Sequence, residues 1–163
     1  MTQRVAFIGL GTMGFPMAGH VSQHDFSVTV FNRTAAKAQQ WADAYSGLCA
    51  KSPALAAQNA DIVLTCVGND EDLRAIYLGD QGAFALAKAG TIFVDHTTAS
   101  AEVAKELAQI AHERGFEFLD APVSGGQAGA ENGVLTVMGG GEAQGLAKVQ
   151  PILDCYADAV TRQ

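Results

Sequence analysis

The chain has 163 residues, 48% hydrophobic and 17% charged, a balance that indicates one globular domain and excludes intrinsic disorder. Its formal net charge is −7 and it has no basic run, which argues against a nucleic-acid or anionic-membrane partner. No signal peptide and no apolar stretch of about 18 residues is found. Because Cys49, Cys66 and Cys155 lie far apart, we expect buried free thiols and a cytoplasmic location.

Short β-rich apolar runs alternate with helical stretches along the chain. The predicted strands are Val5–Ile8, Ser27–Phe31, Leu48–Ala50 (the weakest), Ala60–Val67, Thr91–Asp95 and Phe116–Asp120. The predicted helices are Gly14–His24, Thr34–Tyr45, Pro53–Asn59, Asp70–Tyr77 and Ser100–Arg114. Strands that alternate with helices are joined by right-handed crossovers, so the pattern predicts an α/β, Rossmann-type, doubly wound fold with a mainly parallel sheet.

The end of the chain has a different pattern. A glycine-rich polar segment, Gly125–Gly133, leads into the apolar run Val134–Met138. A helical stretch is predicted over Glu142–Leu153, and Ala157–Gln163 gives one weak strand. No sign of a second domain is found, so we expect a single dinucleotide-binding domain over residues 1–163.

The most informative segment is the first strand and the G-x-G-x-x-G turn directly after it. Gly9 suits the tight turn, Gly11 lets the backbone approach a phosphate, and Gly14 lets the next helix pack against the strand. The amides of Thr12 and Met13 then lie at a helix N-terminus, which favours an anion. The turn therefore predicts a pyrophosphate site, with an ordinary strand–helix turn as the alternative.

The end of the second strand predicts which dinucleotide binds. An NAD-binding domain places an acidic residue there, about 20 residues beyond the glycines, to bind the ribose hydroxyls. This chain has Asn32, Arg33 and Thr34 instead, which can donate hydrogen bonds to a 2′-phosphate. We therefore expect NADP(H) rather than NAD(H), the alternatives being a solvated Arg33 and a Thr34 that only caps the next helix.

The second informative segment is Asp120–Leu135. Ser124 presents a hydroxyl beside Gly125 and Gly126, whose amides can converge into a small anion site suited to a carboxylate. The segment is not the G-x-S-x-G turn of a serine hydrolase, because Pro122 stands where that turn needs glycine.

With these two motifs, Gly9–Met17 and Asp120–Leu135, the chain resembles the β-hydroxyacid dehydrogenases. That family includes 3-hydroxyisobutyrate dehydrogenase, tartronate semialdehyde reductases and, more distantly, 6-phosphogluconate dehydrogenase. The resemblance implies that Val67 and Thr98 lie along the nicotinamide half of the cofactor, and that Ser124, Gly125 and Gly126 bind the carboxylate of a small hydroxyacid substrate. For the pyrophosphate and the adenosine end it implies the residues already named: Gly9, Gly11, Thr12, Met13, Gly14, Asn32, Arg33 and Thr34.

The chain departs from the family after the second motif. The family's general acid/base is a lysine on a helix that opens an all-helical C-terminal domain, and no lysine of this chain stands in that motif. The resemblance therefore implies a cofactor domain without its catalytic residue, and a homo-oligomer formed through the surface that the helical domain would cover. An imine reductase cofactor domain and a non-catalytic nucleotide-binding module are the alternatives.

The histidines give weaker indications. His20 and His24 are one helical turn apart, but no third ligand accompanies them, so we expect a solvated helix end and no metal site. His96 comes directly after a predicted strand, at the edge where cofactor sites form, and we expect it to be a loop histidine whose hydrogen bonds are satisfied.

Overall fold

The computed structural model describes residues 3–140 and 143–162. Its centre is a six-stranded parallel sheet in the order β3-β2-β1-β4-β5-β6. This is the strand order of a dinucleotide-binding fold, as the sequence predicted. The strands are β1 (Gln3–Ile8), β2 (Phe26–Phe31), β3 (Leu48–Cys49), β4 (Ile62–Thr65), β5 (Ile92–Asp95) and β6 (Glu117–Asp120).

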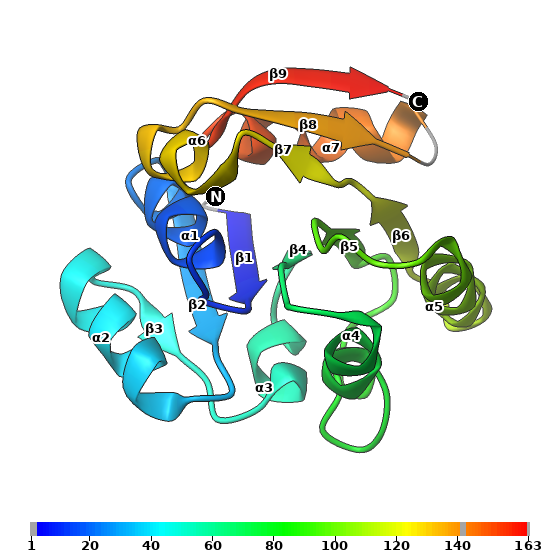
Figure 1. The fold of residues 1–163 in the computed structure, drawn as a ribbon. Coiled ribbons are helices and arrows are strands. Elements are labelled where there is room, and N and C mark those ends of the chain that lie inside the picture. The colour runs from blue at the N-terminus through cyan, green and yellow to red at the C-terminus, as the bar shows by residue number, and fades with distance from the viewer. Residues whose placement is uncertain (1–2, 141–142, 163) are drawn as a thin grey trace.

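Both faces of this sheet are buried, which explains why its central strands read as continuous apolar runs. In β1, Val5 and Phe7 face one core cluster while Ala6 and Ile8 face another. Helices α1 (Gly14–Ser22), α2 (Ala35–Tyr45) and α7 (Ala143–Leu153) cover the first face. Helices α3 (Pro53–Ala57), α4 (Asp70–Tyr77) and α5 (Ala101–Glu113) cover the second, as Figure 1 shows.

The end of the chain was predicted only in part. The weak strand expected there is present over Ala157–Arg162, whereas the helix and the second sheet described next were not predicted. Residues Gly126–Asn132 form helix α6, although glycine and asparagine disfavour helices. Strands β7 (Val123–Ser124), β8 (Leu135–Gly139) and β9 (Ala157–Arg162) form a second sheet in the order β7-β8-β9. Tertiary packing explains the difference, since Ala130, Leu135 and Val137 are fully buried in the cluster that also holds α1.

Several boundaries and burial predictions need correction. Helix α1 ends at Ser22 rather than His24, and β4 is four residues long. Cys155 is buried and Cys66 half-buried, but Cys49 is exposed because it lies on the edge strand β3. The start of the helix predicted from Glu142 and the end of the strand predicted to Gln163 lie outside the described residues. Within the described ranges, no helix is both long and apolar enough to cross a lipid bilayer.

His20 joins α1 to α6, so the prediction of a solvated helix end is wrong for this residue. Its Nε2 lies 2.9 Å from the carbonyl oxygens of both Ala130 and Glu131. A carbonyl oxygen only accepts, so Nε2 carries the proton and donates to the last turn of α6. His24 is exposed, and its Nδ1 donates to the carbonyl of His20 in the last turn of α1.

We therefore expect His20→Ala to lower the free energy of unfolding by about 1–2 kcal/mol, because two carbonyls of α6 lose their donor. His24→Ala is the matched control, since it removes a histidine that makes no bond to α6. Urea unfolding followed by circular dichroism measures both. Equal losses in the two variants would contradict the role of His20 as the link between α1 and α6.

Candidate functional site

A cavity of about 430 Å³ opens at the carboxyl ends of β1, β2 and β4. The strand order reverses between β1 and β4, and ligands of open α/β sheets bind at such a point. The cavity is lined by the glycine turn, by the end of β2 and the residues after it, by the loop after β4 and by α4. The residues are Ile8, Gly9, Leu10, Gly11, Thr12, Met13, Gly14, Phe31, Asn32, Arg33, Thr34, Cys66, Val67, Gly68, Asp72, Ala75 and Ile76.

The three glycines of the turn have different surroundings. Gly9 has φ +102°, and a Cβ there would overlap the carbonyl oxygen of Cys66. A Cβ on Gly14 would overlap the carbonyl oxygen of Gly9 itself. Nothing lies within 4 Å of the place where a Cβ on Gly11 would stand. The first and third glycines are thus required by packing, whereas the second borders the open cavity, a cradle that fits a pyrophosphate.

Hydrogen bonds of the Asn32 side chain join the two turns that border the cavity. Its Oδ1 accepts a hydrogen bond of 2.9 Å from the amide of Leu10, and its Nδ2 donates to the carbonyl of Thr34 at 3.1 Å. Gly9 also donates its amide to the carbonyl of Phe31 at 2.9 Å. The side chain of Asn32 therefore holds the glycine turn in register with the end of β2.

Arg33 and Thr34 extend this wall of the cavity. The side chain of Arg33 is 85% exposed. Thr34 occupies the N-cap position of α2, but its hydroxyl makes no capping hydrogen bond, so the alternative that it only caps the helix is wrong. Arg33 and Thr34 both line the cavity.

Asp72 is a cavity residue that the sequence reasoning missed. Its Oδ1 lies 3.2 Å from Nη1 of Arg33, so an acidic group does reach the end of β2, though from α4. The two residues are 39 positions apart. No local pattern carries this signal, because it depends on how α4 packs at the edge of the sheet.

The other end of the cavity is bordered by the loop after β4, which is joined to the loop after β5. Val67 lines the cavity, and its amide donates to Oγ1 of Thr97 at 3.0 Å. Thr98 is exposed and is not among the residues that line the cavity. The structure thus brings Val67 to the cavity and leaves Thr98 on the surface.

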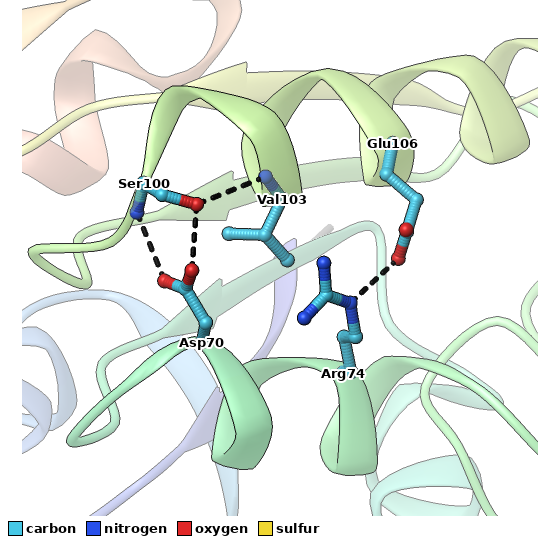
Figure 2. Close-up of polar contacts among 5 residues, drawn as sticks. All are labelled: Asp70, Arg74, Ser100, Val103 and Glu106. Carbon is cyan, nitrogen blue, oxygen red and sulfur yellow. Dashed lines mark hydrogen bonds and ion pairs between the residues drawn. The ribbon is translucent and has the colours of Figure 1, made fainter.

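Polar contacts join helices α4 and α5, which come directly after the loops that follow β4 and β5 (Figure 2). Asp70 accepts hydrogen bonds from the amide of Ser100 at 2.9 Å and from its hydroxyl at 2.6 Å. These two bonds hold the pKa of Asp70 below its usual value. One turn further on, Nε of Arg74 donates to Oε2 of Glu106 at 2.9 Å. The contacts fix the spacing of the two loops.

A chain of buried hydrogen bonds lies under the same loops. Oδ1 of Asp95 accepts from Oγ1 of Thr65 at 2.9 Å and from the amide of Thr97 at 3.1 Å. The hydroxyl proton of Thr65 forms the bond to Asp95, so the hydroxyl of Tyr77, 2.9 Å away, donates to Oγ1 of Thr65. The second carboxyl oxygen of Asp95 is buried without a partner in the described residues. Burial raises the pKa of Asp95 to about 6, against the hydrogen bonds that lower it.

His96 is buried and both of its ring nitrogens form hydrogen bonds, as the sequence predicted for this loop histidine. Its Nδ1 lies 2.6 Å from the carbonyl oxygen of Ala121 and must donate to it. Its Nε2 therefore accepts from the hydroxyl of Tyr156, also at 2.6 Å. Burial lowers the pKa of His96 to about 4, so the ring is neutral and connects the end of β5 to Tyr156, which lies between α7 and β9.

The segment predicted to bind a carboxylate lies outside the cavity. Ser124 is exposed on β7, opposite Thr136 of β8. Gly125 and Gly126 have φ values of +126° and +62°, a backbone that favours glycine, and both are exposed. His20 connects the helix that begins there to α1, the helix that begins at the glycine turn.

Comparison with known proteins agrees with this geometry. A family model described as the NAD binding domain of 6-phosphogluconate dehydrogenase matches residues 4–163. An uncharacterised oxidoreductase of Shewanella frigidimarina is 57% identical over 154 residues, which are 94% of this chain and 53% of that protein. The mitochondrial 3-hydroxyisobutyrate dehydrogenase of Mus musculus is 35% identical over 156 residues, 96% of this chain and 46% of that protein. The chain thus spans about half the length of these relatives.

Solved structures show the same similarity. The 3-hydroxyisobutyrate dehydrogenase of Mycobacterium tuberculosis with L-serine matches with a TM-score of 0.92 and 33% identity, over 99% of this chain and 54% of that one. Psf3 in complex with NADP+ and 2-OPP matches with a TM-score of 0.91 and 28% identity, over 98% and 56%. An imine reductase from Myxococcus stipitatus has a TM-score of 0.88 at 20% identity, over 99% and 55%, which shows the fold alone.

The buried carboxyl of Asp95 gives a prediction of pH dependence. Its pKa rises from 3.8 to about 6 on folding, so its contribution to stability is fully present below about pH 3.8 and is lost as the pH rises through about 6. Asp95→Asn keeps the group neutral. We expect the variant to match the wild type near pH 4 and to exceed its free energy of unfolding by on the order of 2–3 kcal/mol near pH 8.

Asp61→Asn is the control, because the stability that Asp61 contributes changes with pH in the opposite direction. Hydrogen bonds with Lys88 and the Arg4 amide lower the pKa of Asp61, so it stabilises the fold at higher pH and the contribution is lost as the pH falls through the folded-state pKa. Urea unfolding of both variants across this pH range gives the comparison. A difference between Asp95→Asn and wild type that does not change with pH would contradict the assignment.

Proposed function

Since this chain belongs to the family of the NAD binding domain of 6-phosphogluconate dehydrogenase, we propose that it is the NADP(H)-binding half of an oxidoreductase that interconverts a short β-hydroxyacid and its semialdehyde. The observation that carries the proposal is the open space at Gly11, inside a turn whose other two glycines are packed tightly. That space lies at the switch point of the sheet and leads to Arg33 and Thr34. The similarity to 3-hydroxyisobutyrate dehydrogenases supports the substrate class.

The proposed preference for NADP(H) depends on the end of β2. The amides of the glycine turn would hold the pyrophosphate, and the guanidinium of Arg33 and the hydroxyl of Thr34 would hold a 2′-phosphate. Asn32, with its amide used in two internal bonds, would keep that wall in place. A structural relative that was solved with NADP+ supports this choice.

In the proposed reaction the bound nicotinamide accepts or supplies the hydride. Val67 would border the nicotinamide half of the cavity, and Thr98 would approach from the loop after β5. Ser124, Gly125 and Gly126 would orient the substrate carboxylate through one hydroxyl and backbone amides. The neutral His96 and the protonated thiol of Cys66, whose pKa burial raises to about 12, take no part as acid or nucleophile.

The general acid/base of this reaction would come from outside these 163 residues. Among the residues that the structure describes, no lysine lines the cavity. The lysines of the chain are Lys37, Lys51, Lys88, Lys105 and Lys148. We propose that these residues alone bind the cofactor without turning over a hydroxyacid, that the protein works in the cytoplasm, and that a second copy of it is a partner.

The cofactor preference is tested by titrating the chain with NADPH and NADH in a calorimeter. We expect tighter binding of NADPH, and we expect Arg33→Ala to reduce the affinity for NADPH about tenfold while changing that for NADH much less, because only NADPH has the 2′-phosphate. Lys37→Ala is the matched control, since it removes a positive charge that does not line the cavity. Equal affinities of the wild type for the two cofactors would overturn the NADP(H) preference.

The pyrophosphate assignment is tested by Gly11→Val. Nothing within 4 Å obstructs a side chain at this position in the structure, and its φ is not in the left-handed region, so the variant should fold with an unchanged melting temperature. The side chain would fill the space proposed for the pyrophosphate, so binding of NADPH and NADH should both be lost. A folded variant that binds either cofactor with wild-type affinity would refute the assignment.

A further inference from the structure

We propose that Asp72 is a specificity-determining residue that competes with the cofactor's 2′-phosphate for Arg33 and so limits the preference for NADP(H). The inference rests on the proposed dinucleotide function. It concerns a residue that the sequence pattern does not mark, because Asp72 belongs to α4 and Arg33 to the loop after β2. The structure joins them by an ion pair of 3.2 Å at the rim of the cavity.

Asp72 is the less mobile residue of the Arg33–Asp72 ion pair. Asp72 lies in the first turn of α4, where its amide donates a hydrogen bond of 2.8 Å to the N-cap side chain of Asn69. Its side chain is 30% exposed, whereas that of Arg33 is 85% exposed. A long, exposed side chain can move between acceptors, so the guanidinium is the group that changes partner when a phosphate arrives.

The competition affects the two cofactors differently. A 2′-phosphate, with a charge near −2 at neutral pH, must draw Arg33 away from Asp72 and also approach the carboxylate itself. The 2′-hydroxyl of NAD(H) is uncharged, so it meets no such repulsion. Asp72 therefore weakens the binding of NADP(H) more than that of NAD(H). The cofactor preference predicted from Asn32, Arg33 and Thr34 thus also depends on an acidic residue of α4.

The test is Asp72→Asn, with Glu71→Gln as the matched control. Both substitutions remove one negative charge from the first turn of α4, but Glu71 is exposed and does not line the cavity. The probes are NADPH and NADH, together with adenosine 2′,5′-bisphosphate and 5′-AMP, which differ only in the 2′-phosphate. Calorimetry gives each affinity, and thermal melts check that the variants fold.

We expect Asp72→Asn to tighten NADPH and adenosine 2′,5′-bisphosphate about three- to tenfold, and NADH and 5′-AMP less than about twofold, as fits the loss of one exposed ion pair and one repulsion. Glu71→Gln should leave the ratio of affinities unchanged. An unchanged ratio in Asp72→Asn, or an equal change for all four probes, would overturn the inference. The wild-type ratio tests the proposed NADP(H) preference separately, since Asp72→Asn can widen the ratio whichever cofactor the wild type prefers.

A double-mutant cycle tests the competition for Arg33 itself. In the Arg33→Ala background no guanidinium remains to be shared, so Asp72→Asn should tighten adenosine 2′,5′-bisphosphate clearly less than it does in the wild type. The same gain in both backgrounds would show that Asp72 acts only by direct repulsion and would overturn the competition mechanism.

Discussion

The close approach of backbone to backbone at the first turn is the constraint on which the site depends. Gly9 lies against the carbonyl of Cys66 at the end of β4, and Gly14 lies against the carbonyl of Gly9. No residue with a Cβ fits at either position without displacing main-chain atoms. This contact brings α1 close to the sheet and leaves a cavity, bordered by Gly11, between the ends of β1 and β4.

The loops around that cavity are held together by side chains from different elements. Asn32 connects the end of β2 to the turn after β1, and Thr97 connects the loop after β5 to Val67 after β4. Asp70 and Ser100 repeat this connection between α4 and α5. Each contact is a hydrogen bond that fixes a loop before any ligand arrives, so the wall is preorganised.

The sequence predicted the features that depend on residues close to one another in the chain. Alternation of apolar runs and helical stretches indicated the parallel sheet, and the turn at Gly9–Gly14 indicated the position of the cavity. Helix α6 was missed because its glycines and asparagine have low helix propensity, and it is stabilised by packing on α1 and β8. Asp72 and His20 were missed as contacts because their partners are 39 and 110 positions away in the chain.

Helix α1 connects the two motifs that the sequence singled out. It begins at Gly14, directly after the turn that borders the cavity, and His20 in its last turn binds the end of α6. Gly125 and Gly126, which we propose for the substrate carboxylate, stand at the start of α6. One nine-residue helix therefore links the proposed substrate segment to the glycine turn. The hydride transfer that we propose depends on the relative position of these two segments, so a short helix with a side-chain bond at its far end is a suitable connection.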